Sequence, residues 1–170
     1  MQDSSAEPAL LYVRPDAPTL GSYNSFIVDP VRVSYSDPNM AEIPVEQLTR
    51  IQLYFQNAVI TELREAGIEV GTRSQEGRMR LTLTITGIKA PSAAANLSNA
   101  VLPVSLSVGE VTVEGQFRNA EADRLDAVVV SRSQGSRVLN STPWSTWADV
   151  ESGLDQWAKG FTESVVASRR

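Results

Sequence analysis

The sequence predicts an α+β fold, in which a mostly antiparallel sheet of about five or six strands carries two amphipathic helices on one face. Two observations lead to this prediction. Segments with strand-type alternation follow one another between two helix-type segments, and each helix-type segment has a single apolar stripe. Successive strands favour antiparallel pairing, and a one-stripe helix must bury its stripe against the sheet. The 170 residues, 42% hydrophobic and 21% charged, suit one globular domain without internal repeats.

The first 22 residues have the composition of an extended leader or tether. Prolines and a glycine punctuate small polar residues there, at Pro8, Pro15, Pro18 and Gly21. An apolar patch at residues 10–13 interrupts this segment and is a candidate for docking on the domain. We therefore expect a leader over residues 1–22 and a single α+β domain over residues 23–170.

The first strand and the first helix follow directly. Residues 25–35 alternate as a strand that is broken at Pro30, which predicts a sheet edge or a bulge at that point. Residues 44–66 have apolar positions three and four apart, which predicts a long amphipathic helix, and Gly67 is suited to end it. Those apolar positions are Leu48, Ile51, Phe55, Val59, Leu63 and Ala66.

The central strands are predicted from period-two alternation. One face of the strand at residues 78–86 is apolar and the opposite face carries arginines and threonines. The apolar phase of residues 104–108 shifts in residues 111–117, which predicts a bulge or a turn at Gly109 and Glu110. Residues 119–123 predict a hairpin loop that leads to a strand at about residues 125–131. Residues 133–136 predict the end of that strand. The apolar face of the first of these strands consists of Met79, Leu81, Leu83 and Ile85.

A terminal helix is predicted to begin at Thr142 and Pro143. Its apolar stripe includes Trp147, Trp157 and Phe161, which are either core residues or a surface for a partner or ligand. Helical spacing favours the core interpretation. The remaining members of the stripe are Val150, Leu154 and Val165.

The residues that usually carry catalysis are scarce. The chain has no His and no Cys, which removes disulfides, thiolate chemistry and the common transition-metal ligands, and its only lysines are Lys89 and Lys159. Glu110 and Glu114 share a strand face about 13 to 14 Å apart, too far for a carboxylate pair. We therefore expect no catalytic, cofactor or metal residues and no enzymatic activity.

A calcium loop is also not predicted. The series Asn119, Glu121 and Asp123 resembles the start of such a loop, but Arg124 and Val130 stand where glycine and a carboxylate are needed. Phosphate-binding glycine motifs and nucleophile elbows are absent from the sequence. The net charge of −5 and the pI of about 4.8 argue against nucleic acid as a partner. No apolar run reaches the length of a membrane-spanning helix, and no signal peptide begins at Met1, so we expect a cytosolic or an already processed chain.

Several short motifs follow one another along the chain. They are Tyr23-x-x-Phe26-Ile27-Val28-Asp29-Pro30-Val31-Arg32-Val33, the helix at residues 53–63, Arg78-x-Arg80-Leu81 through Ile85, residues 123–127, and Trp157-Ala158. In this order they resemble one bacterial family of exported lipoproteins of unknown function, known as domain of unknown function 3313 (DUF3313). The similarity spans roughly residues 23–165. It implies an exported, usually lipid-anchored envelope protein without assigned activity, although the lipid-bearing cysteine of that family is absent here.

Three function classes remain open from the sequence. The favoured one is a non-catalytic domain on the periplasmic side of the cell envelope, anchored to a membrane by an N-terminal lipid. It would bind or scaffold an envelope protein or another envelope component, and it could form a homo-oligomer. The alternative is an envelope-associated hydrolase that uses carboxylate, Arg or Tyr chemistry. A cytosolic protein of unrelated role is the third. A deep pocket with convergent carboxylates would favour the enzyme, and an exposed apolar patch or sheet edge would favour the binding module.

Overall fold

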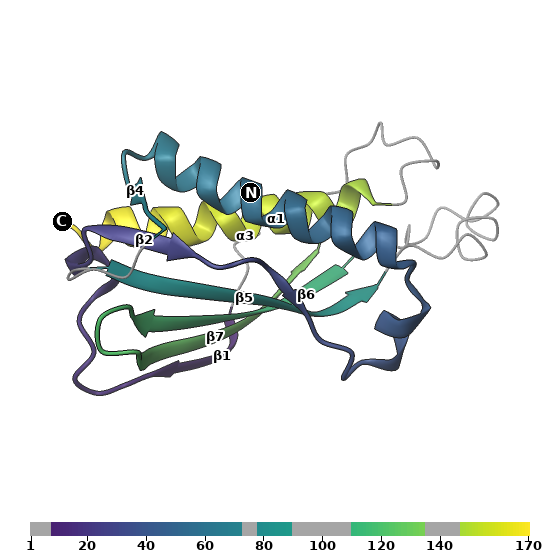
Figure 1. Cartoon of the computed structure of the whole chain (residues 1–170), viewed down its shortest axis with the longest axis horizontal. Coiled ribbons are helices and arrows are strands. Elements are labelled where there is room, and N and C mark those ends of the chain that lie inside the picture. Colours follow the sequence, from purple (N-terminus) through teal and green to yellow (C-terminus); the bar gives the residue numbers. More distant parts are fainter. Residues whose placement is uncertain (1–7, 73–77, 90–109, 135–146) are drawn as a thin grey trace, which may run out of the picture.

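The computed structural model describes residues 8–72, 78–89, 110–134 and 147–170 of the chain (Figure 1). Two long helices lie together on one side of a twisted sheet, as the sequence predicts. In chain order the elements are β1 (Pro8–Val13), the short 3-10 helix η1 (Leu20–Ser22), β2 (Ser25–Val28), β3 (Arg32–Val33), the 3-10 helix η2 (Pro38–Glu42), α1 (Val45–Glu65), β4 (Glu69–Val70), β5 (Arg78–Lys89), β6 (Glu110–Asn119), β7 (Arg124–Gln134) and α3 (Ala148–Ala167).

The sheet is mixed rather than wholly antiparallel. Its order is β1-β7-β6-β5-β2-β4, and β3 pairs with β5 beyond the end of β2. The long pairs β5/β6, β6/β7 and β1/β7 are antiparallel, whereas β2 runs parallel to β4 and β5, and β3 runs parallel to β5. The parallel pairs arise because α1 carries the chain back along the sheet before β4 and β5 begin. Pro30 lies in the gap between β2 and β3, so the predicted break is confirmed.

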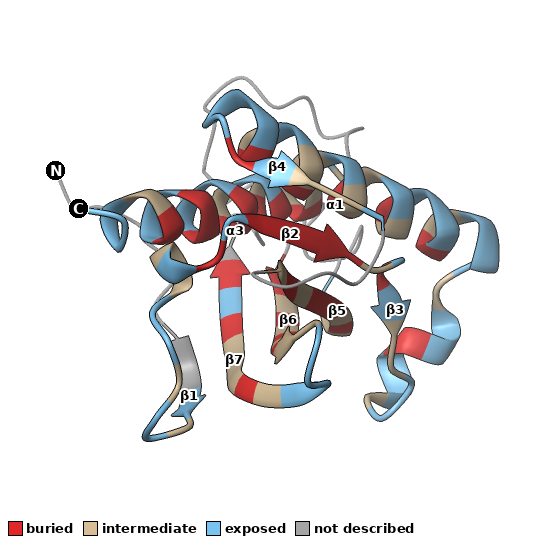
Figure 2. Cartoon of the chain, turned by 60° about the vertical axis from the view of Figure 1, so that its left-hand side comes forward, coloured by how far each residue is buried: buried red, intermediate tan, exposed pale blue. Residues whose placement is uncertain are grey.

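The core lies between the helices and one face of the sheet. The predicted apolar face of β5 is buried, with Met79, Leu81, Leu83 and Ile85 each at most 1% exposed. Two residues of β6, Val113 and Phe117, extend this face, and the apolar stripe of each helix packs against it (Figure 2). The α1 stripe consists of Leu48, Ile51, Phe55, Val59 and Leu63, all buried.

The end of α1 forms at Gly67, as the sequence predicts. Gly67 has a φ of +74°, its N–H donates to the Arg64 carbonyl at 2.9 Å, and the N–H of Ile68 donates to the Leu63 carbonyl at 2.9 Å. This pair of bonds is the Schellman motif, which satisfies carbonyls that would otherwise be unpaired at a helix end. Ile68 and Leu63 are both buried, so the motif also directs the chain into β4.

The sheet extends into the predicted leader. β1 lies within residues 1–22 and pairs with β7 through residues 8–13, so that part of the segment is an element of the domain rather than a tether. The apolar residues 10–13 form most of this strand. The prediction of a leader was based on the prolines around them.

Other predictions are met in part. The hairpin loop between β6 and β7 forms where expected, while β7 reaches Gln134, which lies within residues 133–136, where the strand was predicted to end. The predicted strand at residues 104–108, the phase shift at Gly109 and the helix start at Thr142 and Pro143 lie outside the described residues. Within those residues the terminal helix begins at Ala148.

We expect alanine substitutions at the two exposed glycines Gly67 and Gly160 to change stability in opposite directions. A Cβ at either position meets no atom within 4 Å, so the difference comes from the backbone conformation alone. Gly67→Ala must adopt a left-handed backbone conformation and should lower the free energy of unfolding by about 1 to 2 kcal/mol. Gly160→Ala lies inside α3 and should raise it by about 0.5 to 1 kcal/mol. Urea denaturation of both variants measures the difference, and equal effects would contradict this account of the α1 end.

Candidate functional site

The feature of the structure best suited to recognition is β1, the terminal strand of the sheet. Figures 1 and 2 both place it at the margin of the sheet, away from the two helices. Three consecutive apolar side chains, Leu11, Tyr12 and Val13, are 56%, 50% and 53% exposed there. Natural edge strands are commonly protected by lysine, proline or a bulge, and residues 11–13 contain none of these devices.

The pairing of β1 with β7 fixes which backbone groups face outward. The N–H of Arg14 donates to the carbonyl of Asp126 at 2.9 Å, and the register is constant from Leu10 to Val13. Hydrogen-bonded and non-hydrogen-bonded positions alternate along an antiparallel ladder. The polar backbone groups of residues 10, 12 and 14 therefore face β7, whereas those of Leu11 and Val13 point away from the sheet.

The side chains of this strand divide between the two faces of the sheet. Leu11 is opposite Val129 on the face that carries the helices, and Tyr12 is opposite Val128 on the other face. Because apolar side chains stand on both faces and the outer N–H and C=O groups are unpaired within the described sheet, β1 has the character of an internal strand. It is thus a surface that could accept a further strand.

A buried carboxylate, Asp126, fastens β1 to the domain. It lies where the register of β7 against β6 shifts by one residue, which is a β-bulge, and it is 1% exposed. Its Oδ1 accepts hydrogen bonds from Nε of Arg14 at 3.1 Å and from Nε of Arg124 at 3.2 Å, and its Oδ2 accepts one from the Tyr23 hydroxyl at 2.6 Å. Arg169, next to the end of α3, donates to the carbonyl of Tyr23 at 2.9 Å. The bulge therefore joins β1, the approach to β2 and the C-terminal end of α3.

The two acidic groups of this cluster shift each other's proton affinity. Burial raises the pKa of Asp126, but hydrogen bonds from Tyr23, Arg124 and Arg14 outweigh it and hold the pKa below its ordinary value of 3.8. Burial, then the hydrogen bond to Asp126 and its negative charge, raises the pKa of Tyr23 from 10.0 to about 12. Asp126 is therefore ionised and Tyr23 is neutral across the physiological range.

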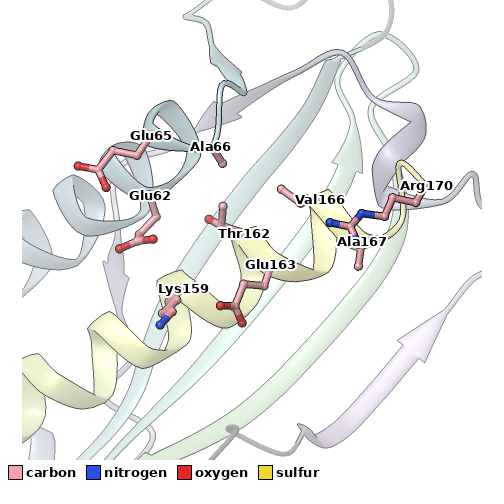
Figure 3. Close-up of a pocket in the computed structure, with 9 residues that line it drawn as sticks. All are labelled: Glu62, Glu65, Ala66, Lys159, Thr162, Glu163, Val166, Ala167 and Arg170. Carbon is pink, nitrogen blue, oxygen red and sulfur yellow. The ribbon is translucent and has the colours of Figure 1, made fainter.

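A second candidate surface is a groove between the outer sides of α1 and α3. Toward the C-terminal ends of the helices it has a volume of about 460 Å³, and its lining mixes acidic and basic side chains (Figure 3). Glu62 and Lys159 also line a neighbouring hollow of about 610 Å³ that extends to Tyr54 and Asp155. The lining residues of the first part are Glu62, Glu65, Ala66, Lys159, Thr162, Glu163, Val166, Ala167 and Arg170.

The groove does not contain an activated nucleophile among the described residues. The Tyr54 hydroxyl donates to Oδ2 of Asp155 at 2.7 Å, so it links the two helices. Burial, followed by this hydrogen bond and the charge of Asp155, raises the pKa of Tyr54 well above its ordinary value, which makes the phenol a weaker acid at neutral pH. Oγ1 of Thr162 is buried without a hydrogen-bond partner, and the other side chains are those of an ordinary helix surface.

The aromatic residues singled out in the sequence occupy different positions. Trp157 and Phe161 are buried in the core, where Trp157 makes an edge contact with Phe55 and stacks on Phe161. Nε1 of Trp157 donates to Oγ of Ser131 at 2.6 Å, so the polar atom of this buried ring is also paired. Trp147 precedes α3 and is partly buried against the core.

The acidic residues considered in the sequence have structural partners. Oε1 of Glu110 pairs with Nζ of Lys89 at 3.4 Å and with Nε of Arg132 at 3.2 Å, and Oε1 of Glu114 accepts a hydrogen bond from Gln116 at 2.9 Å. In the loop that resembles a calcium site, Oδ1 of Asn119 instead accepts backbone hydrogen bonds at 3.1 and 2.9 Å, which stabilise the β6–β7 turn.

The described residues include neither a membrane-spanning helix nor a cluster suited to a metal ion. None of their helices is both long and apolar enough to cross a membrane. Across the same residues, no three His, Cys, Asp or Glu side chains are grouped in a way that could hold a metal ion.

Fold and edge together define the chain as an α+β domain with two helices on one face of a mixed sheet and a terminal strand, β1, that pairs on one side only within the described residues. It belongs to the DUF3313 family of proteins of unknown function, whose model matches residues 1–161. This agrees with the resemblance found in the sequence. Among curated proteins, none matches the chain.

Solved bacterial structures share the fold at low sequence identity. The PelC dodecamer from Paraburkholderia phytofirmans is 13% identical, with a TM-score of 0.51, and the match covers 89% of this chain and 97% of that chain. The protein XCC0632 from Xanthomonas campestris is 12% identical, with a TM-score of 0.55, and the match covers 95% of this chain and 94% of that chain. At these identities the similarity shows a common fold.

We expect Trp157→Ala to lower the free energy of unfolding by about 3 to 5 kcal/mol, because it leaves a cavity between Phe55 and Phe161. Trp157→Phe keeps an aromatic ring but leaves Ser131 without its donor, and should cost about 1 to 3 kcal/mol. Denaturant unfolding followed by tryptophan fluorescence measures both. A loss of less than about 1 kcal/mol for the alanine variant would indicate that α3 is not part of the core.

The Asp126 cluster predicts how stability depends on pH. Because the pKa of Asp126 is lowered, its stabilisation is present above pH 3.8 and is lost as the pH falls through the folded-state pKa. Because the pKa of Tyr23 is raised, its stabilisation is present below pH 10 and is lost as the pH rises through about 12. Asp126→Asn should be about 1 to 3 kcal/mol less stable than wild type at pH 7. This difference in stability should become smaller at acid pH, because the wild-type carboxylate is then protonated.

Urea denaturation at a series of pH values tests this account, with Tyr23→Phe as the matched variant. That variant should be less stable at pH 7 and should lack the part of the alkaline decline that Tyr23 causes. If wild type and Asp126→Asn differ by the same amount at pH 7 and at acid pH, the stabilisation does not come from the ionised carboxylate.

Proposed function

We propose that this domain is a non-catalytic binding or scaffolding module of the bacterial cell envelope, and that its contact surface is the edge of β1. The observation that carries the proposal is the exposure of Leu11, Tyr12 and Val13 on a strand whose outer backbone groups are unpaired within the described sheet. An added strand would satisfy those groups and cover both rows of side chains. This mode of recognition is known as β-augmentation.

The envelope location is supported by the family resemblance, and a role in an assembly is supported by a solved structure with the same fold. The family resemblance of the sequence implies an exported protein on the periplasmic side, held at a membrane by a lipid on a cysteine ahead of this domain. In addition, PelC, which shares the fold, forms a dodecamer. A role in an assembly of envelope proteins agrees with both.

A binding role also agrees with the described polar residues. The carboxylates of Asp126 and Glu110 are bound to arginines, and the Tyr54 phenol links the two helices. These groups hold the domain together, whereas in β1 unpaired backbone groups of the described sheet and three consecutive exposed apolar side chains occur together.

We expect a photo-crosslinking amino acid at position 12 to give covalent adducts in the envelope of the producing bacterium. The same amino acid at position 53 is the matched control, because Leu53 is 57% exposed on α1 and Tyr12 is 50% exposed on β1. Fractionation of the cells before electrophoresis tests the location in the same experiment.

Adducts that form at position 12 and not at position 53, in the envelope fraction, would support the proposal. It would be refuted by equal adducts from both positions, by their absence from position 12, or by recovery of the protein from the cytosol alone.

A further inference from the structure

We infer that the strand that pairs with β1 belongs to a second copy of this chain, and that the two β1 strands run antiparallel about a two-fold axis beside Tyr12. The inference rests on the proposed function, because it names the partner of the same edge. Two sheets joined in this way would form one continuous sheet with both pairs of helices on the same side.

The register follows from the backbone groups that point outward. Leu11 and Val13 are the described positions of β1 whose N–H and C=O groups face away from β7. An antiparallel pair centred on Tyr12 sets Leu11 of one copy opposite Val13 of the other, twice by symmetry. Each of these two pairs exchanges two N–H···O hydrogen bonds, and Tyr12 faces Tyr12 at the intervening position, where strands approach most closely.

This register covers the apolar residues that the fold leaves exposed at the edge. Leu11 and Val13 lie on the helix face and would pack against each other across the two-fold axis. Tyr12 lies on the opposite face and would pair with its symmetry mate, a favourable arrangement for aromatic residues on neighbouring strands. All three side chains are at least half exposed in the single chain.

Charge and topology favour a second copy. The chain carries a net charge of −5, yet residues 11–13 carry none, so self-pairing brings no like charges into direct opposition there. Arg14, at the end of the strand, is bound to Asp126. At the other side of the sheet, β3 and β4 contain only two residues each. Head-to-tail addition of β1 to that side would pair it with strands of two residues, whereas the two-fold pair centred on Tyr12 matches residues 11–13 of one β1 with the same three residues of the other.

Cysteine crosslinking tests the register directly, since the chain has no cysteine of its own. At a non-hydrogen-bonded antiparallel position the two Cα atoms lie about 4.5 Å apart, within the range that a disulfide spans. We expect Tyr12→Cys to give a covalent dimer at least tenfold faster than Leu53→Cys under mild oxidation. Leu53 supplies the matched control because it is equally exposed on α1.

Sedimentation velocity without oxidant tests the association itself. At about 100 μM we expect wild type and Leu53→Lys to sediment as dimers. Leu11→Lys places a charge in the apolar contact between the two copies and should sediment as a monomer. Its melting temperature should be unchanged, because the Leu11 side chain lies outside the core.

Any of the following results would overturn the inference. A wild-type monomer at 100 μM, a dimer that persists in Leu11→Lys, or equal crosslinking of Tyr12→Cys and Leu53→Cys would each exclude the two-fold β1 pair. If the chain is monomeric but the photo-crosslinker at position 12 captures a different envelope protein, this inference fails and the proposed function stands. If neither association occurs, both fail.

Discussion

The attachment of β1 depends on one buried carboxylate. Asp126 has a hydrogen-bond donor from the segment after β1, another from the start of β7 and a third from the approach to β2. Burial of a carboxylate is costly unless such partners are present, so the three segments must meet for the charge to be tolerated. The bulge in β7 makes this possible, because an extra residue can turn its side chain away from the regular ladder. The exposed edge is therefore held in place by an interior contact.

The helix face of the sheet and its β1 edge differ in what they leave exposed. The helix face is closed by aromatic and aliphatic packing, in which the ring of Trp157 fills the space beside Phe55 while its N–H is bound by Ser131. The groove between the helices is lined by side chains of both helices, and its phenol is bound to Asp155. Recognition along a strand needs only exposed backbone groups and apolar side chains, and β1 presents both.

The sequence was sufficient for features that depend on local periodicity. The α1 stripe, the buried face from Met79 to Ile85 and the helix end at Gly67 each follow from residues close together in the chain. The parallel pairing of β2 with β5 was not predicted, because it depends on how α1 returns the chain across the sheet. Asp126 was also missed as an anchor. It is the single acidic residue of β7, next to the apolar residues 127–130, which is a signal of a buried polar role, but its partners Arg14 and Tyr23 are more than 100 residues away in sequence.

The residues that fasten β1 are different from the residues that it exposes. Position 12 forms its backbone hydrogen bonds with β7, and the backbone groups of positions 11 and 13 face outward whatever side chains these positions carry. The side chains of residues 11–13 are at least half exposed, while the segment that follows β1 is held through Arg14 and Asp126. Substitutions at residues 11–13 would therefore change the chemistry of this edge while the contacts that hold the strand in the domain remain.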